Sequence, residues 1–187
     1  GDRHGSPIRF HGRDYTFLGR YSDRMTAADH VDGLLAEWAR ERPEIDVSPI
    51  QVIGRLHRLA MRLTAELEIV FREHGLSEGD FDVLSALRRA GAPFERRPSD
   101  IAEHTMVTTG AVSKRLDRLE AAGLVHRRAS EVDGRGRVVA LTPEGLRVID
   151  AAFADHVANE ARLLASVPPA DRAALERILR GWIAELA

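Results

Sequence analysis

The sequence of 187 residues contains no cysteine. This absence excludes disulfide bonds, a thiolate nucleophile and thiolate ligands for zinc or an iron–sulfur cluster. The eight histidines are scattered along the chain and include no His-Glu-x-x-His pair, which would place two metal ligands on one face of a helix. We therefore expect neither a metal ion nor another cofactor.

Long apolar runs are absent as well. No window of the sequence approaches the ~18 uninterrupted apolar residues that a membrane helix needs, and the N-terminus lacks the apolar segment of a signal peptide. With 44% hydrophobic and 30% charged residues, the composition fits a soluble globular domain. We expect a cytoplasmic protein that has no membrane partner.

Lysine is nearly absent, because Lys114 is the single lysine among 27 basic residues, and the net charge is −2. The charges are nevertheless segregated. Between Arg96 and Arg137 there are nine Lys or Arg residues and six Asp or Glu residues, which gives this stretch a charge of +3 and leaves −5 on the remainder. Because local basic patches determine phosphate contact, this stretch is compatible with nucleic-acid binding.

The first 24 residues show no helical or alternating period and predict a loose arm. From Thr26, which forms a capping pair with Asp29, apolar residues recur at helical spacing until Pro43 and predict an amphipathic helix. A second apolar stripe follows Ser48 and predicts a long helix that ends at Gly75.

The next part of the chain has the order helix, turn, helix, hairpin. The expected elements are a helix that starts at Ser77, a break of the chain from Pro93 to Pro98, a short helix from Ser99, a helix from Thr108 to Ala122, and strands at 124–128 and 137–141. This order is typical of the winged helix-turn-helix. A long helix from Thr142-Pro143 to about residue 165 and a last helix over 170–186 complete the prediction.

The helix from Thr108 carries the pattern of a DNA-recognition helix. Its apolar residues form one stripe, which leaves hydroxyl and basic side chains on the other face. Hydroxyl groups reach phosphates or base edges, and arginine can form paired hydrogen bonds with guanine. A solvated amphipathic helix would show the same pattern, but the following glycine, strand pair and arginine-tipped turn favour the DNA-binding interpretation, with Arg135 entering a minor groove. The expected DNA contacts are Thr108, Thr109, Ser113, Lys114, Arg118, Arg135 and Arg137.

Several motifs resemble the MarR family of bacterial transcription regulators over about residues 48–187. They are Ser99-Asp100-Ile101-Ala102-Glu103, Val107-Thr108, Ala111-Val112-Ser113-Lys114, Leu116-Asp117-Arg118-Leu119-Glu120, Gly123-Leu124-Val125, Asp133-x-Arg135 and Leu141-Thr142-Pro143-x-Gly145. The resemblance implies a homodimer with interlocking helices that presents two winged domains to a pseudopalindrome in double-stranded DNA. The family usually carries two arginines after the wing aspartate. Gly134 stands in the first place here, so we expect a more flexible wing or one contact fewer.

The predicted fold is mainly α with a small β-hairpin, a winged helix-turn-helix joined to an interlocking helical dimerisation region. The expected ranges are a flexible arm (1–25), an extra N-terminal helix (26–43), the DNA-binding domain (76–142) and the dimerisation region (48–75 and 143–187).

Arg115 departs from the family pattern, because it lies beside the inward stripe of the recognition helix, where an apolar residue is usual. A charge at such a place needs a partner or a ligand. A snorkelling arginine or a structural ion pair is the alternative. The chain also resembles the urate-responsive branch of the family, in Trp38-Ala39-Arg40, in Asp82-Val83-Leu84, and in the pair Arg115 and Arg127.

An aromatic face together with an arginine suits a flat anion, such as a purine oxoanion or an aromatic carboxylate. We therefore predict a ligand site formed by Trp38, Asp82, Arg115 and Arg127. Asp82 would repel an anion unless Arg127 engaged it, so we expect an Asp82–Arg127 pair that the ligand disturbs. The alternatives are packing of the extra helix for Trp38, a solvated carboxylate for Asp82 and a phosphate contact for Arg127.

These patterns predict a homodimeric DNA-binding regulator, a repressor that a small planar anion of the urate or xanthine kind, or an aromatic acid, releases from its operator. Two alternatives stay open: a MarR-type regulator that responds to a different carboxylate or phenolic ligand, and one that responds to no small ligand or to a partner protein. An enzyme is disfavoured, because there is no Gly-x-Ser-x-Gly motif and no phosphate loop, and Gly134-x-Gly136 lacks a third glycine.

Overall fold

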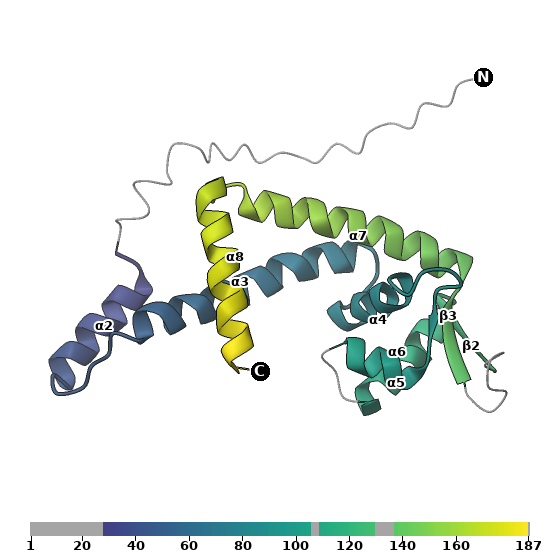
Figure 1. Ribbon diagram of the computed structural model, residues 1–187, viewed down its shortest axis with the longest axis horizontal. Coiled ribbons are helices and arrows are strands. Elements are labelled where there is room, and N and C mark those ends of the chain that lie inside the picture. The colour runs from purple at the N-terminus through teal and green to yellow at the C-terminus, as the bar shows by residue number, and fades with distance from the viewer. Residues whose placement is uncertain (1–27, 106–108, 130–136, 187) are drawn as a thin grey trace, which may run out of the picture. The chain divides into compact units, whose positions relative to one another are not determined.

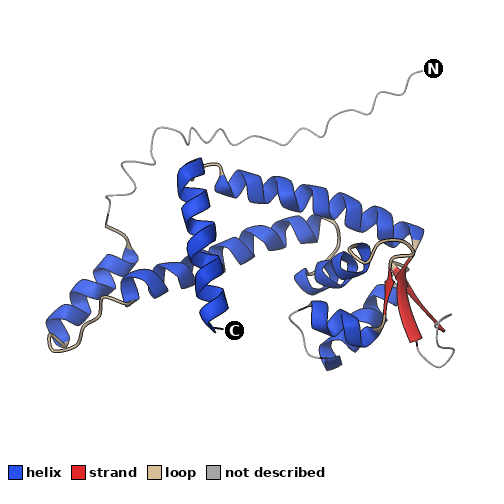
Figure 2. Ribbon diagram, in the orientation of Figure 1, coloured by secondary structure: helices blue, strands red, loops and turns tan. Residues whose placement is uncertain are grey.

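The computed structural model describes residues 28–105, 109–129 and 137–186. The chain divides into two compact units, one made of Gly1–Val52 and Leu164–Ala187 and the other of Ile53–Leu163. Figure 2 shows that helices dominate the described residues and that the strands gather in one small sheet. Within this part of the chain, no helix combines the length and the apolar character that crossing a membrane would require.

The first unit contains α2 (His30–Glu41) and α8 (Pro169–Leu186). Asp29 is the N-cap of α2. Its carboxylate accepts hydrogen bonds from the backbone N–H groups of Val31 and Asp32 at 2.8 and 3.2 Å, and the Asp32 carboxylate accepts one from the N–H of Asp29. The helix expected between Thr26 and Pro43 is therefore present, but Asp29 caps it with Asp32 as its partner, and Thr26 lies outside the described residues.

The second unit contains the remaining elements. They are most of α3 (Ile50–Glu73), α4 (Glu78–Arg88), β1 (Glu95–Arg96), α5 (Pro98–His104), α6 (Thr109–Ala121), β2 (Val125–Ala129), β3 (Arg137–Leu141) and most of α7 (Pro143–Leu164). The predicted helices and both predicted strands are present with shifts of one or two residues at their ends. α5, for example, starts at Pro98 after the N-cap Arg97.

The sheet differs from the predicted hairpin. It has three antiparallel strands in the order β1-β3-β2, in which Glu95 lies opposite Ala140 and Val125 lies opposite Leu141. The segment from Pro93 to Pro98, expected to be only a break, contains β1. A strand of two residues is too short to show an alternating pattern, which is why the sequence did not reveal it.

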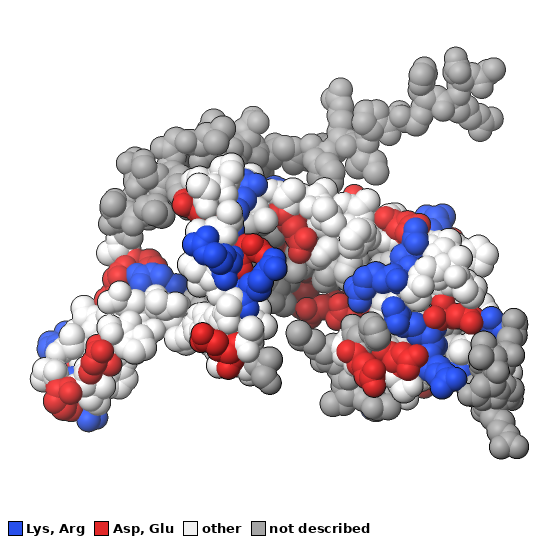
Figure 3. Space-filling model, viewed as in Figure 1, with Lys and Arg blue, Asp and Glu red and all other residues white. Residues whose placement is uncertain are grey.

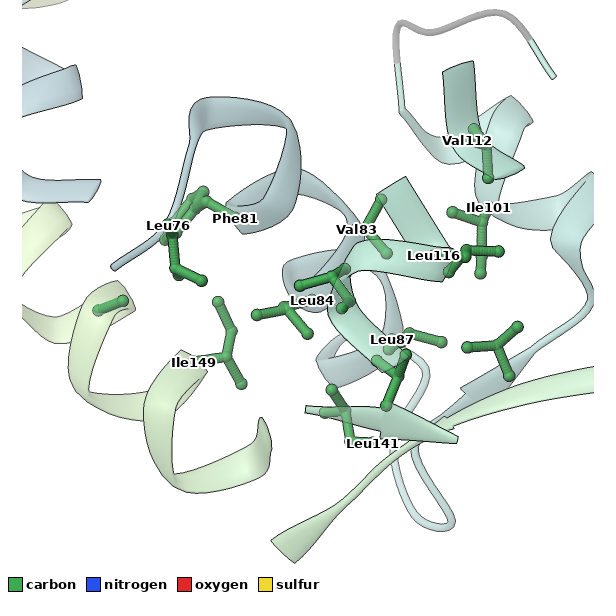
Figure 4. Close-up of a cluster of buried hydrophobic side chains, with 14 of the residues drawn as sticks. Leu76, Phe81, Val83, Leu84, Leu87, Ile101, Val112, Leu116, Leu141 and Ile149 are labelled. Carbon is green, nitrogen blue, oxygen red and sulfur yellow. The ribbon is translucent and has the colours of Figure 1, made fainter. Parts of the chain in front are cut away.

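The core of this unit joins the helix-turn-helix to the sheet and to α7 (Figure 4). α4 contributes Leu84 and Leu87, and α6 contributes Val112, Leu116 and Leu119, all at most 2% exposed. The core also includes Phe71, Leu76, Phe81, Val83, Ile101, Val125, Val139, Leu141, Ile149 and Ala152. Each fully buried leucine or valine contributes roughly 1.5–3 kcal/mol of hydrophobic free energy. The inward stripe predicted for the recognition helix is therefore confirmed.

The junction of β3 and α7 packs backbone against backbone. The Thr142 hydroxyl donates to the carbonyl of Gly123 at 2.7 Å and accepts from the N–H of Gly145 at 2.9 Å. A Cβ atom at Gly145 would lie 1.9 Å from the carbonyl oxygen of Leu124, so only glycine fits at this position. The Thr142-Pro143-x-Gly145 motif thus holds the start of α7 against the start of β2.

Candidate DNA-binding surface and effector site

The outward face of α6 carries part of the predicted DNA contacts. Ser113 and Lys114 are exposed on this face, and Arg137 is exposed at the start of β3. Thr109 begins α6, but only its backbone is described, and Thr108 and Arg135 lie outside the described residues. On the face of this unit turned to the viewer in Figure 3, basic and acidic side chains lie next to each other.

Arg118, also predicted to contact DNA, is engaged by the protein. Its Nε and Nη2 atoms donate to Oδ1 of Asp80 at 3.2 and 2.5 Å, and Nη2 donates to the Ser77 hydroxyl at 3.0 Å. Asp80 is 5% exposed and closes the capping box of α4, in which its Oδ2 accepts from the backbone N–H and the hydroxyl of Ser77. Burial raises the pKa of Asp80, but the hydrogen bonds from Arg118 and Ser77 outweigh it, so the pKa lies below its usual value.

Arg127 joins β2 to the recognition helix. Its backbone N–H donates to Oε1 of Glu120 at 2.9 Å, its Nη1 donates to Oε2 of the same residue, and its Nη2 donates to Oδ1 of Asp117 at 2.6 Å. The backbone and side-chain hydrogen bonds from Arg127 lower the pKa of Glu120. The Arg127 side chain therefore fixes β2, which forms the base of the wing, to α6.

The expected Asp82–Arg127 pair is wrong for this structure, because Arg127 is bound by Asp117 and Glu120. These two acids lie three residues apart, so they share the face of α6 that is turned to β2. Asp82 lies on α4 instead. The spacing of Asp117 and Glu120 was the signal in the sequence that could have identified the partners of Arg127.

Arg128, the next residue of β2, binds a residue of β1, the strand at the opposite edge of the sheet. Its Nη2 donates to Oε2 of Glu95 in β1 at 2.6 Å, although β3 lies between the two strands. Adjacent strand residues point to opposite faces, so Arg127 and Arg128 hold β2 from both sides. The sequence could not indicate this pair, because β1 itself was not predicted.

Arg115 is half-buried and lies against the first turn of α4. A Cβ atom added to Gly79 would be 2.1 Å from Cζ of Arg115, so the guanidinium occupies the space that any other residue would fill. Its Nη1 atom is buried and has no hydrogen-bond partner in the described part of the chain. The sequence predicted that a charge at this place needs a partner or a ligand, and Nη1 of Arg115 is a buried donor that has no acceptor among the described residues.

Asp82 supplies negative charge near Arg115. Burial raises the pKa of Asp82, and the neighbouring Arg115, Arg89 and His156 lower it by a smaller amount, so the pKa lies above its usual value. Asp82 is therefore a partly desolvated carboxylate whose nearby charges do not fully compensate its burial.

His156, one of the neighbours of Asp82, belongs to a cluster of aromatic rings. Phe71 and Phe81 stack with ring centroids 4.5 Å apart, and the His156 ring lies 4.9 Å from Phe81 and 5.5 Å from Phe71. Nδ1 of His156 is buried without a hydrogen-bond partner among the described residues. Sequence reasoning missed this group, because a core phenylalanine or histidine is unremarkable by itself. The predicted aromatic residue Trp38 lies on α2 in the first unit and is 49% exposed.

These elements define a winged-helix DNA-binding domain. It has two helices in a helix-turn-helix, the second of which packs on the core by its apolar stripe and exposes a polar outer face, and a small sheet that forms the wing. The family model described as the MarR family matches residues 74–136. The HTH-type transcriptional regulator PecS of Dickeya dadantii is 37% identical over 149 residues, which cover 80% of this chain and 90% of PecS. The protein belongs to the MarR family, and it is a DNA-binding transcriptional regulator and not an enzyme.

Solved structures agree with this assignment. AbsC, a MarR family transcriptional regulator from Streptomyces coelicolor, is 30% identical with a TM-score of 0.65, and the match covers 76% of this chain and 97% of AbsC. BpsR of Bordetella bronchiseptica is 26% identical with a TM-score of 0.60, and the match covers 71% of this chain and 98% of BpsR. The DNA binding of BpsR is regulated by 6-hydroxynicotinic acid.

Proposed function

We propose that the protein is a homodimeric repressor that a small planar anion, bound at Arg115, releases from its operator. The observation that carries this proposal is the unsatisfied Nη1 of Arg115, buried where the recognition helix meets the first turn of α4. A buried donor without an acceptor is costly, and an anionic oxygen would both satisfy it and balance its charge.

The expected ligand is flat because a guanidinium such as that of Arg115 stacks well on a planar, conjugated anion. The imidazole of His156, a further neighbour of Asp82, is also a flat ring. 6-Hydroxynicotinic acid, which regulates BpsR, is an aromatic acid and supports this ligand class. Urate and xanthine are the other candidates that the sequence favours. Trp38 stays a predicted ligand contact.

An anion at Arg115 would act on DNA binding through α6. Arg115 lies on this helix two residues from Ser113 and next to Lys114, so movement of its guanidinium off Gly79 would alter how the outer face is held. A ligand can shift the protein only by the difference between its affinities for the two states. The ligand must therefore bind the DNA-free form more tightly than the DNA-bound form.

The homodimer is supported by apolar side chains that the single chain leaves exposed. These are Val52, Ile53, Leu59 and Met61 on α3, Phe153 and Val157 on α7, and Ile178, Ile183 and Leu186 on α8, all between 45% and 78% exposed. Where such side chains form a contiguous patch, they commonly mark a surface that another protein chain covers. A dimer would present two recognition helices to a pseudopalindromic operator, with contacts from Ser113, Lys114 and Arg137 together with Thr108, Thr109 and Arg135.

The test combines ligand binding with release of DNA. Urate, xanthine and 6-hydroxynicotinate are titrated against the protein while tryptophan fluorescence is recorded, and the same compounds are added to gel shifts on the DNA upstream of the protein's own gene. We expect one of them to bind and to release DNA. Trp38→Phe should remove most of the fluorescence change, because Trp38 is the predicted contact and the chain has two tryptophans.

Arg115→Ala should abolish the response and leave a folded dimer that still binds DNA. Arg147→Ala is the matched control, because Arg147 forms an exposed ion pair with Glu144 on α7. A compound that binds tightly without lowering DNA affinity would refute the release mechanism. A response that survives in Arg115→Ala would move the site elsewhere and favour a different carboxylate or phenolic ligand.

A further inference from the structure

We propose that Arg118 is a positioning residue, which fixes the recognition helix on the first turn of α4 by binding Asp80 and Ser77 and serves operator recognition through this contact rather than by touching DNA. The sequence pattern alone places Arg118 among the DNA contacts. The described hydrogen bonds assign its Nε and Nη2 to protein acceptors.

Releasing Arg118 from Asp80 would be costly. Its partner Asp80 is 5% exposed, whereas the Arg118 side chain is 58% exposed. A buried carboxylate that loses its counter-charge is strongly unfavourable, because its desolvation is no longer compensated by the hydrogen bonds of the pair. If Arg118 turned outward to a base, the donors left to the Asp80 carboxylate among the described residues would be the hydroxyl and the N–H of Ser77.

The position of Arg118 along α6 links its contact with α4 to the outer face of the recognition helix. It lies four residues after Lys114, and residues four apart share one side of a helix. Binding Arg118 to the N-terminal turn of α4 therefore limits rotation of α6 about its axis. This rotation decides whether Ser113 and Lys114 face the groove, so an Arg118 that never touches DNA would still determine how well the bases are read.

Several hydrogen bonds connect the residues of this contact to one another. Asp80 is the N3 residue of the α4 capping box and accepts from Arg118, and the hydroxyl of the N-cap Ser77 donates to Asp80 and accepts from Arg118. The start of α4 and the second half of α6 are thus joined by three side chains that hydrogen-bond one another. A lysine at 118 would keep the charge but could not form this forked contact.

The experiment compares Arg118→Ala, Asp80→Asn and the double variant. The probe is the tightest-binding duplex that the wild-type protein selects from a randomised pool, with an unrelated duplex of equal length as the reference. Affinities are measured by fluorescence anisotropy at several salt concentrations. Circular dichroism and thermal melting confirm that each variant is folded, and Arg147→Ala is the control, for which we expect wild-type affinity.

Asp80→Asn gives the sharpest comparison. Removing a negative charge next to DNA should strengthen binding if only general electrostatics act. A positioning role predicts the opposite: Asp80→Asn and Arg118→Ala should each weaken binding to the selected duplex by about tenfold, the size of one lost specific contact. The double variant should be no weaker than either single variant, because both remove one interaction. The salt slope should stay that of the wild type.

Two results would overturn the proposal. If Arg118→Ala lowers the salt slope by about 0.9 while Asp80→Asn does not, Arg118 contacts a phosphate. If Arg118→Ala relaxes the preference at one base pair and Asp80→Asn leaves it intact, Arg118 reads a base. Should Asp80→Asn not fold, Arg118→Lys replaces it: wild-type affinity in that variant would show that charge alone is needed and would equally overturn the forked contact.

Discussion

Asp80 and Asp82 lie two residues apart on α4, and the fold shifts their pKa values in opposite directions. Hydrogen bonds from Arg118 and Ser77 outweigh the effect of burial at Asp80, whereas burial prevails over Arg115, Arg89 and His156 at Asp82. On the same helix, the fold thus stabilises the ionised form of Asp80 and destabilises the ionised form of Asp82.

Asp80→Asn should destabilise the protein at pH 7. The folded pKa of Asp80 lies below its usual value of 3.8, so its contribution is present above that value and is lost as the pH falls through the folded pKa. We expect a loss of about 1–2 kcal/mol, because Arg118 is largely exposed and solvent weakens the pair. Urea denaturation at pH 7 and at pH 3 measures it, and the difference from wild type should shrink at pH 3. An equal difference at both values would contradict the assignment.

Asp82→Asn should behave in the opposite way. The folded pKa of Asp82 lies above 3.8, so the stability linked to its protonated form is present below that value and is lost as the pH rises through the folded pKa. At pH 7 the asparagine removes the cost of burying the charge, and the variant should be at least as stable as wild type. Anions should also bind it more tightly, since the repelling carboxylate is gone. Denaturation curves and ligand titrations at pH 7 check both expectations, and a variant that is less stable at pH 7 would refute the first.

Gly79→Ala should separate ligand response from stability. The new Cβ would meet Cζ of Arg115 at 2.1 Å, but the guanidinium ends a flexible side chain and can move away. Alanine favours the helix by about 0.5–1 kcal/mol over glycine, which offsets the displacement. Because the guanidinium is then displaced from Gly79 without any ligand, we expect a folded protein that binds DNA more weakly than wild type and has lost most of its response to the anion.

Gly33→Ala on α2 is the control for this substitution, because among the described residues no atom outside the neighbouring backbone of α2 lies within 4 Å of the added Cβ. It should raise stability and keep the response. Retention of the full response in Gly79→Ala would show that the seat of Arg115 on α4 is not required.

Arg127→Ala should weaken DNA binding on every sequence. It leaves Asp117 and Glu120 without their cation and frees the base of the wing from α6. Two uncompensated carboxylates on the recognition helix repel phosphates, so the loss should be largest at low salt. Binding to selected and unrelated duplexes across a salt series measures it. Arg127→Lys keeps the charge and should recover part of the affinity; a loss confined to the selected duplex would instead indicate a base contact.

Patterns that repeat along the chain predicted most of this fold. The apolar stripe of Val112, Leu116 and Leu119 identified the buried side of α6, and Thr142 and Gly145 marked the start of α7. The sequence did not predict β1, because a strand of two residues is too short to show a periodic pattern. Charge partners were predicted poorly for a different reason: Arg127 could bind any acid within reach, and only the rotation of α6 decides that Asp117 and Glu120 face it.

The close contact of Gly145 with Leu124 determines which parts of the winged domain can yield. With no space for even a methyl group between them, the start of α7 and the start of β2 must move as one body. A shift of the recognition helix against the wing must therefore be taken up by polar side chains such as Arg127 and Glu120. These contacts weaken with salt, whereas the packing at Gly145 does not. Raising the ionic strength should consequently lower the free-energy cost of that shift without altering the packing of Gly145 against Leu124.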